Sequence, residues 1–197
     1  MKPSPGRPLE FDPDVALDAA MQVFWRNGYE GTSMQDLLDA MQLSKSSLYQ
    51  AFGGKQALFE RCITRYGDEM IGSLREALQR SRSGVGFIRQ FLESVLDEAR
   101  GVCEARGCLV LNTANEFARR NSRIAEAVSQ GLGRFHDVLQ AAVERAQQEG
   151  DIPQKRDAAM LANFLVSSMS GLKTMSKAGA DEDTLRGIVD LSLKALQ

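Results

Sequence analysis

The sequence predicts an all-α protein in two parts, a three-helix head followed by a six-helix body. Apolar residues recur at intervals of three and four through most of the chain, and capping residues stand at the starts of the resulting segments. No alternating β-branched run is bounded by a hairpin turn. The chain has 197 residues, 43% of them apolar, which is enough to bury a sizeable core.

The first two helices are short and have clear boundaries. The first spans about residues 12–27, with Pro13 in its first turn and Gly28 as its stop. Ser33 can cap the second, and Asp36, three residues later, can bond back to the helix start. The apolar residues of the second helix fall on one stripe, at Met34, Leu37, Leu38 and Met41.

A third helix follows a break at Gln42-Leu43 and can be capped by Ser44. Leu48, Ala51 and Phe52 share one face and predict a core contact. The opposite face is small, hydroxyl-rich and able to donate hydrogen bonds; it comprises Lys45, Ser46, Tyr49 and Gln50. A helix that lies in a DNA major groove needs this composition, because it must approach phosphates and base edges closely.

The remaining helices are longer. One starts at Gly54 or Lys55 and runs to about Arg80, where the polar stretch 81–84 ends it. Five more are predicted, over Val85 to Glu104, Cys108 to Arg119, Ser122 to Gln148, Asp157 to Ser176 and Asp181 to Leu196.

Several segments of the first 65 residues together resemble the TetR family of bacterial regulators: Gly6-Arg7-Pro8, residues 24–33, Ser47-Leu48-Tyr49 and residues 52–59. The resemblance implies a helix-turn-helix DNA-binding domain over residues 1–55 and a ligand-binding and dimerisation domain over 56–197. It further implies a homodimer that represses transcription at a palindromic operator and is released by a small-molecule effector.

By the same resemblance, Arg7 lies near the DNA backbone or minor groove, and Lys55 holds a phosphate at the start of the long helix. The full expected DNA-binding set is Arg7, Ser33, Ser44, Lys45, Ser46, Ser47, Tyr49, Gln50 and Lys55. Gln42 departs from the glycine usual in the family's turn, and a positive φ there would cost about 1 kcal/mol.

The charge balance does not favour DNA. The net charge is −2, and residues 1–55 contain five Lys or Arg against seven Asp or Glu. Few phosphate contacts per subunit imply weak binding by a monomer, so a dimer that reads two half-sites is expected.

The last two helices predict that dimer. The segment 158–172 is apolar or small nearly all round, and a matching stripe follows in the final helix, so one subunit is not expected to cover both. The predicted interface is Phe164, Leu165, Ser168, Leu172, Leu185, Ile188 and Val189. The alternative is a core within one subunit.

The effector site is predicted on the middle helices. Its candidate residues are Met70, Leu74, Phe91, Val95, Cys103, Cys108, Leu111, His136 and Phe164. Cys108 stands where a helix should begin, near Arg106, which would stabilise its thiolate. Cys108, with Cys103 as resolving partner, is therefore a candidate sensor of electrophiles or oxidants, or of a soft metal. The alternative is that these thiols fill space in the core.

Other function classes find little support. The single histidine, His136, has no evident partners for a catalytic triad, so no enzyme, cofactor or resident metal is expected. The three cysteines lack disulfide spacing, and the N-terminus lacks an apolar leader, so the expectation is a cytoplasmic protein without a membrane partner. A helical ligand-binding protein without a DNA function stays open as a second hypothesis.

Overall fold

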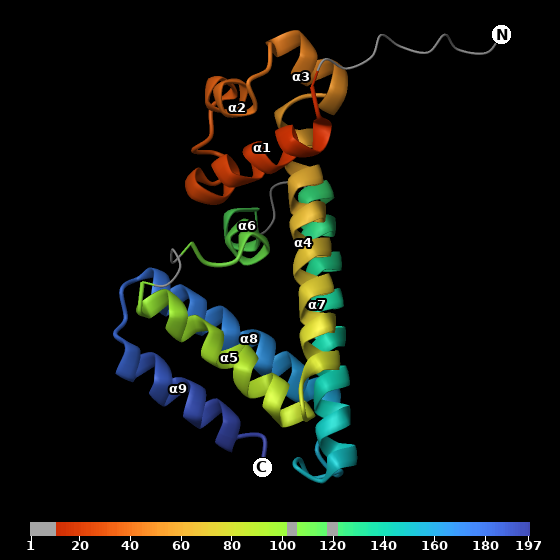
Figure 1. Ribbon diagram of the computed structural model, residues 1–197, viewed down its shortest axis with the longest axis vertical. Helices are drawn as coiled ribbons and strands as arrows, with labels where there is room; N and C mark the ends of the chain where they lie inside the picture. Colours follow the sequence, from red (N-terminus) through yellow and green to blue (C-terminus); the bar gives the residue numbers. More distant parts are fainter. Residues whose placement is uncertain (1–10, 102–105, 118–121) are drawn as a thin grey trace, which may run out of the picture. The chain divides into compact units, whose positions relative to one another are not determined.

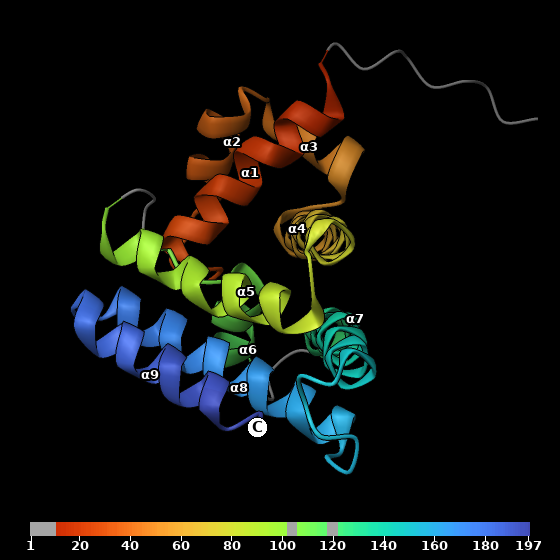
Figure 2. The same cartoon turned by 60° about the horizontal axis from the view of Figure 1, so that its bottom comes forward.

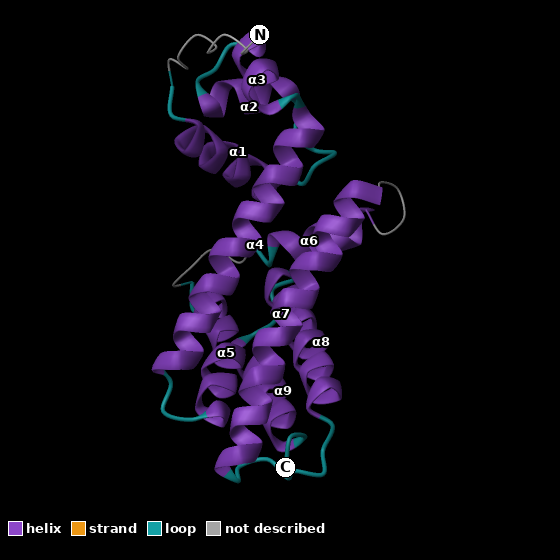
Figure 3. Ribbon diagram, turned by 90° about the vertical axis from the view of Figure 1, so that its right-hand side faces the viewer, coloured by secondary structure: helices purple, strands orange, loops and turns teal. Residues whose placement is uncertain are grey.

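The computed structural model describes residues 11–101, 106–117 and 122–197, and within them all regular secondary structure is helical (Figure 3). The helices are α1 (Pro13–Asn27), α2 (Met34–Met41), α3 (Lys45–Phe52), α4 (Lys55–Arg80), α5 (Gly84–Ala99), α6 (Leu109–Phe117), α7 (Ser122–Glu149), α8 (Ala158–Lys177) and α9 (Glu182–Lys194). The predicted fold class and the order of the helices are confirmed.

One predicted boundary was wrong. α5 was expected to continue to Glu104, but it ends at Ala99. Gly101 has a φ of 70°, in the left-handed region that stops an α-helix. The spacing of apolar residues does not show a turn that depends on one glycine. Gly101 itself was the signal in the sequence that the helix ends there.

Two compact units make up the chain, Met1–Ile63 and Thr64–Gln197, and the division falls inside α4. The first turns of α4 complete the core of the head. The ring of Phe59 lies 4.7 Å from that of Phe24 and 4.9 Å from that of Tyr29 (centroid distances). Cys62 is fully buried there, with its Sγ 3.8 Å from the carbonyl oxygen of Leu17.

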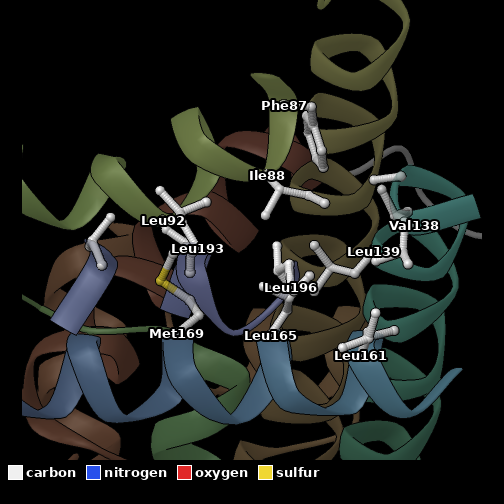
Figure 4. Close-up of a cluster of buried hydrophobic side chains, with 14 of the residues drawn as sticks. Phe87, Ile88, Leu92, Val138, Leu139, Leu161, Leu165, Met169, Leu193 and Leu196 are labelled. Carbon is white, nitrogen blue, oxygen red and sulfur yellow. The ribbon is translucent and has the colours of Figure 1, made fainter. Parts of the chain in front are cut away.

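The body is built around one apolar cluster to which α4, α5, α7, α8 and α9 contribute. The ribbons of α5, α8 and α9 lie side by side there (Figures 1 and 2). α8 presents Leu161, Leu165 and Met169 to this cluster, and they meet Leu92 of α5 and Leu139 of α7 (Figure 4). Residues at a spacing of four lie on one helix face, so this side of α8 is fully used within the subunit.

That packing revises the predicted dimer interface. Leu165, Leu172, Leu185 and Val189 are at most 1% exposed and belong to the core of their own subunit. A partner subunit could not contact them without unfolding the body. The periodicity correctly marked them as buried residues, but a sequence does not distinguish burial within a subunit from burial between subunits.

An ion pair on α7 holds the turn between α4 and α5. The Arg145 guanidinium donates hydrogen bonds to the carbonyl oxygens of Leu78, Ser81 and Arg82, at 2.9, 3.1 and 3.1 Å. It also donates to Glu149 at 2.7 Å, and the other carboxylate oxygen of Glu149 accepts the N–H of Gly84 at 2.7 Å. The two residues thus satisfy carbonyls at the end of α4 and the first N–H of α5.

These contacts also set the ionisation of Glu149. The hydrogen bond from the Gly84 N–H and the one from the Arg145 guanidinium both lower the pKa of its carboxyl group. The carboxylate therefore stays charged over a wider range of pH.

No helix within the described ranges 11–101, 106–117 and 122–197 is long and apolar enough to span a membrane.

Candidate DNA-binding and effector sites

The start of α3 is a cluster of hydroxyl groups. Ser44 caps the helix, because its Oγ accepts the N–H of Ser47 at 3.2 Å. The same Oγ lies 2.9 Å from Ser46 Oγ and 2.8 Å from Ser47 Oγ. The first turn of α3 carries no acidic residue, and Lys45 follows the cap. The positive end of the α3 dipole is therefore not neutralised from within the helix, which favours a phosphate there.

The two faces of α3 differ as predicted. Leu48 and Phe52 are buried, whereas Lys45, Ser46 and Gln50 are exposed and Tyr49 is 49% exposed. An inward-facing Tyr49 or Lys45 would have excluded α3 as a groove-reading helix. Whether these side chains contact DNA stays a prediction.

Gly54 fixes the position of Tyr49. Gly54 has a φ of 119°, and a Cβ placed on it would lie 3.2 Å from Cε1 of the Tyr49 ring. The ring thus rests on the bare backbone between α3 and α4. Glycine is required there both for the backbone conformation and for the close approach.

Ser33 caps α2, but in a different electrostatic setting. Its Oγ accepts the N–H of Asp36 at 3.1 Å, while the Asp36 carboxylate accepts the N–H of Ser33 at 2.8 Å. The hydroxyl and the backbone of Ser33 together lower the pKa of Asp36. The Asp36 carboxylate already accepts the Ser33 N–H, so Ser33 can offer only its hydroxyl proton to DNA.

The turn between α2 and α3 contains the one non-glycine residue with positive φ among the described residues, Gln42, at φ 54° and ψ 42°. Its N–H bonds back to carbonyl oxygens of Leu38 and Asp39. The conformation expected where the family usually has glycine is therefore present with glutamine.

Two cations on α4 lie close to aromatic rings of the head. Lys55 Nζ lies 4.2 Å from the centre of the Tyr29 ring, a cation–π contact that holds the ammonium near the start of α4. Arg61 lies over the Phe52 ring and donates to the carbonyl oxygen of Ala51 at 3.0 Å. Arg61 was missed by the sequence analysis, and no local pattern pointed to it. Arg7 lies outside the described residues.

The body contains a cavity of about 510 Å³ between α6 and the C-terminal half of α8. Cys108 and Leu111 of the predicted effector set line it. Cys108 directly precedes α6, and its carbonyl oxygen accepts the N–H of Asn112 at 2.8 Å, so it stands at the helix start as predicted. The remaining lining residues are Gly107, Asn112, Ala114, Ser170, Gly171, Lys173, Thr174, Met175 and Lys177.

The other predicted effector residues do not line this cavity. Val95 is completely buried in the body core, and Met70, Leu74 and Phe91 pack against that core. Apolar side chains are typical both of a pocket lining and of a core. In the structure these four residues belong to the core or pack against it.

Of the three remaining predicted positions, two lie elsewhere on α7 and α8. His136 Nε2 lies 3.2 Å from the carbonyl oxygen of Ala159, whereas Phe164 is 37% exposed on α8. Cys103 lies outside the described residues. Within the described part of the chain, no group of three His, Cys, Asp or Glu side chains is arranged to hold a metal ion.

The outer face of α8 and α9 is unusually apolar for a surface. Met160 is 64% exposed, Met175 is 36% exposed, and Leu191 on α9 is 67% exposed. Met160, Phe164, Gly171 and Met175 follow helical spacing along α8, on the side away from the core. Exposed apolar side chains that follow one side of a helix are typical of an interaction surface.

Comparison with known proteins agrees with this arrangement. Residues 16–62 match the family described as "Bacterial regulatory proteins, tetR family", and residues 84–190 match "Tetracyclin repressor-like, C-terminal domain". The regulator YezE of Bacillus subtilis (strain 168) is 31% identical, covering 97% of this chain and 99% of its own. The repressor ComR of Escherichia coli (strain K12) is 29% identical, covering 98% and 93%.

A solved structure extends the likeness to three dimensions. The TetR family regulator CifR, a cysteine mutant complexed with 26-bp double-strand operator DNA, has a TM-score of 0.84 and 30% identity, covering 98% of this chain and all of its own. With both domains matched and relatives alike over their full length, the chain belongs to the TetR family of bacterial helix-turn-helix transcriptional regulators, and it is a DNA-binding regulator of transcription.

Proposed function

We propose that the protein is a homodimeric repressor of a palindromic operator, released when a small molecule occupies the cavity between α6 and α8. The observation that carries the DNA part is the start of α3, where three hydroxyl groups, Lys45 and an un-neutralised helix dipole face solvent together. The complex of CifR with operator DNA supports this assignment.

The proposed subunit contact is the outer face of α8 and α9. Its residues are Met160, Phe164, Gly171 and Met175 of α8 with Leu191 of α9, and the partly buried Ser168 and Ile188 lie beside them. Two copies of this face form a four-helix contact across a two-fold axis, and small residues such as Gly171 allow the helices to approach closely. Of the predicted interface, this contact keeps Phe164, Ser168 and Ile188, and the four residues in the core drop out of it.

Two subunits are needed because a single subunit makes few phosphate contacts and therefore binds DNA weakly. A helix-turn-helix dimer places its recognition helices in successive major grooves, about 34–36 Å apart. An effector relieves repression only if it binds more tightly to a dimer in which this spacing is lost.

Operator binding can be tested with DNA from the region upstream of the protein's own coding sequence. Fluorescence anisotropy should show binding that weakens steeply with salt, because each phosphate contact releases counterions. Lys45→Met should weaken binding and, by removing one contact per subunit, make the dimer's log–log salt slope shallower by about 2. Lys155→Met, an exposed lysine of the body, is the control and should change neither. If the anisotropy of the DNA does not rise on addition of protein even at about 50 mM salt, the proposal is refuted and a ligand-binding protein without a DNA function is favoured.

The subunit contact has its own test. Phe164→Glu places a charge in the apolar face and should convert the dimer to a monomer in analytical ultracentrifugation. Val15→Glu makes the same kind of change at an exposed apolar residue of the head and should leave the dimer intact. A wild-type protein that is monomeric at micromolar concentration would overturn the assignment.

A second candidate for release is covalent modification of Cys108. The observation that favours it is that Cys108 lines a cavity instead of filling the core, unlike the buried Cys62. Oxidants or electrophiles should then lower the operator affinity of the wild type but not that of Cys108→Ser. Equal responses from both proteins would exclude this form of release.

A further inference from the structure

The cavity between α6 and α8 has a distinct chemical character. Its lining combines apolar side chains, such as Leu111 and Met175, with the amide of Asn112 and two lysines, Lys173 and Lys177. None of its described lining residues is acidic. A cavity of about 510 Å³ falls within the usual range for small-molecule sites, about 300–1,000 Å³.

The two lysines reach the cavity from one side. Both belong to the last turns of α8 and are four residues apart, so they lie on the same face of that helix. Lys173 is partly buried and has other contacts, while Lys177 is exposed. Two positive charges on one rim of a half-enclosed apolar cavity favour a negatively charged guest, because the nearby protein reduces screening by water.

The opposite wall carries the polar groups of the turn before α6. Asn112 donates through Nδ2 to the carbonyl oxygen of Arg106 at 2.9 Å, and Gly107, between them, has a φ of 71°. A Cβ at Gly107 would lie 3.1 Å from Oδ1 of Asn112. The turn and the amide thus hold each other in place, which keeps Cys108 at the cavity wall.

From this juxtaposition we propose that the cavity binds a small organic anion, with its carboxylate or similar group at Lys173 and Lys177 and its apolar part against Leu111 and Met175. The inference rests on the proposed effector role of the cavity and specifies the chemical class of the effector. The Cys108 side chain then lies beside the bound molecule, so its rate of alkylation depends on the charge of the reagent that enters the cavity.

Cys108 allows a direct test with two alkylating reagents of nearly equal size, iodoacetate and iodoacetamide. In each reaction the thiolate sulfur forms a bond to the methylene carbon, and iodide leaves with the electron pair of the broken C–I bond. Both reagents meet the same thiolate through the same opening, so the ratio of their rates cancels exposure and thiolate fraction. What remains in the ratio is the preference of the cavity for a negative charge.

The full-length protein makes the measurement specific. Trypsin cleaves after Arg61, Arg100 and Arg106, which leaves Cys62, Cys103 and Cys108 on three separate peptides. Mass spectrometry can therefore follow Cys108 alone. The reference is the same peptide alkylated in the urea-unfolded protein.

We expect the iodoacetate-to-iodoacetamide ratio at Cys108 in the folded protein to exceed that of the unfolded chain at least about fivefold, and to fall as NaCl is raised. The double variant Lys173→Gln, Lys177→Gln should return the ratio to the unfolded value. The control Lys155→Gln, Lys194→Gln removes the same charge from exposed sites outside the cavity and should keep the ratio high.

A folded ratio within twofold of the unfolded one would overturn the proposal, and so would a high ratio that survives loss of both cavity lysines. Circular dichroism of each variant would establish that it is folded before its ratio is used. Since the assay contains no DNA, its failure would leave operator binding untouched. A protein that passes it but does not bind DNA would instead refute the proposed function.

Discussion

Gly84 offers the sharpest test of how the body is packed. A Cβ added there would lie 2.4 Å from the carbonyl oxygen of Ala142, 2.6 Å from the backbone nitrogen of Ala146 and 2.9 Å from its Cβ. These atoms belong to α7, and two of them are backbone atoms that cannot rotate away. Gly84→Ala must therefore push α5 away from α7 and strain the 2.7 Å hydrogen bond from Gly84 to Glu149.

The magnitude follows from three contributions. Overpacking costs about 1–3 kcal/mol. Weakening the hydrogen bond to the Glu149 carboxylate adds to this loss. Replacing glycine by alanine returns less here than in the middle of a helix, because Gly84 is the first residue of α5. The net expectation is a loss of roughly 1–3 kcal/mol, which lowers the melting temperature by roughly 2–12 °C for a chain of this size.

The control is Gly72→Ala. Gly72 is exposed in the interior of α4, and a Cβ there meets nothing within 4 Å. It should raise stability by about 0.5–1 kcal/mol through helix propensity alone. Thermal and urea unfolding at one fixed protein concentration would measure both variants. A Gly84→Ala protein as stable as Gly72→Ala would show that α5 and α7 do not approach as described.

Three further substitutions test single features. Gln42→Gly should stabilise the protein by about 1 kcal/mol in urea unfolding, since glycine adopts the left-handed conformation freely, whereas Gln42→Ala should not. Ser33→Ala removes the cap that accepts the Asp36 N–H and should cost about 1 kcal/mol, measured the same way. The hydrogen bond and charge of Arg100 help lower the pKa of Glu182 from 4.5 to about 2. Ionised Glu182 therefore stabilises the fold above the unfolded pKa, so the melting-temperature advantage of wild type over Glu182→Gln should shrink as pH falls from about 4.5 to about 2.

The helices could be predicted because their signals are local. Ser33 and Ser44 cap α2 and α3, and Gly28 ends α1, each read from a few neighbouring residues. The exposed face of α3 followed from the same periodicity, since burying Leu48 and Phe52 turns Lys45 and Gln50 outward.

The effector site and the subunit contact could not be predicted in this way. Val95 and Leu111 are both apolar residues of middle helices, yet one is core and the other lines the cavity. Leu165 and Phe164 are adjacent, and only the packing of α8 against α5 and α7 decides which of them faces inward. Arg61 and Arg145 donate to carbonyl oxygens 10 and 67 residues away in sequence, and such contacts leave no pattern around either residue.

Gly171 and Met175 belong at once to the wall of the cavity and to the outer apolar face of α8. A molecule in the cavity would touch two residues that the proposed subunit contact also uses, so the two binding equilibria would be coupled. By thermodynamic reciprocity, a guest that loosens self-association must itself be held less firmly as the protein is concentrated. The response to the proposed effector would then depend on the concentration of the regulator in the cell.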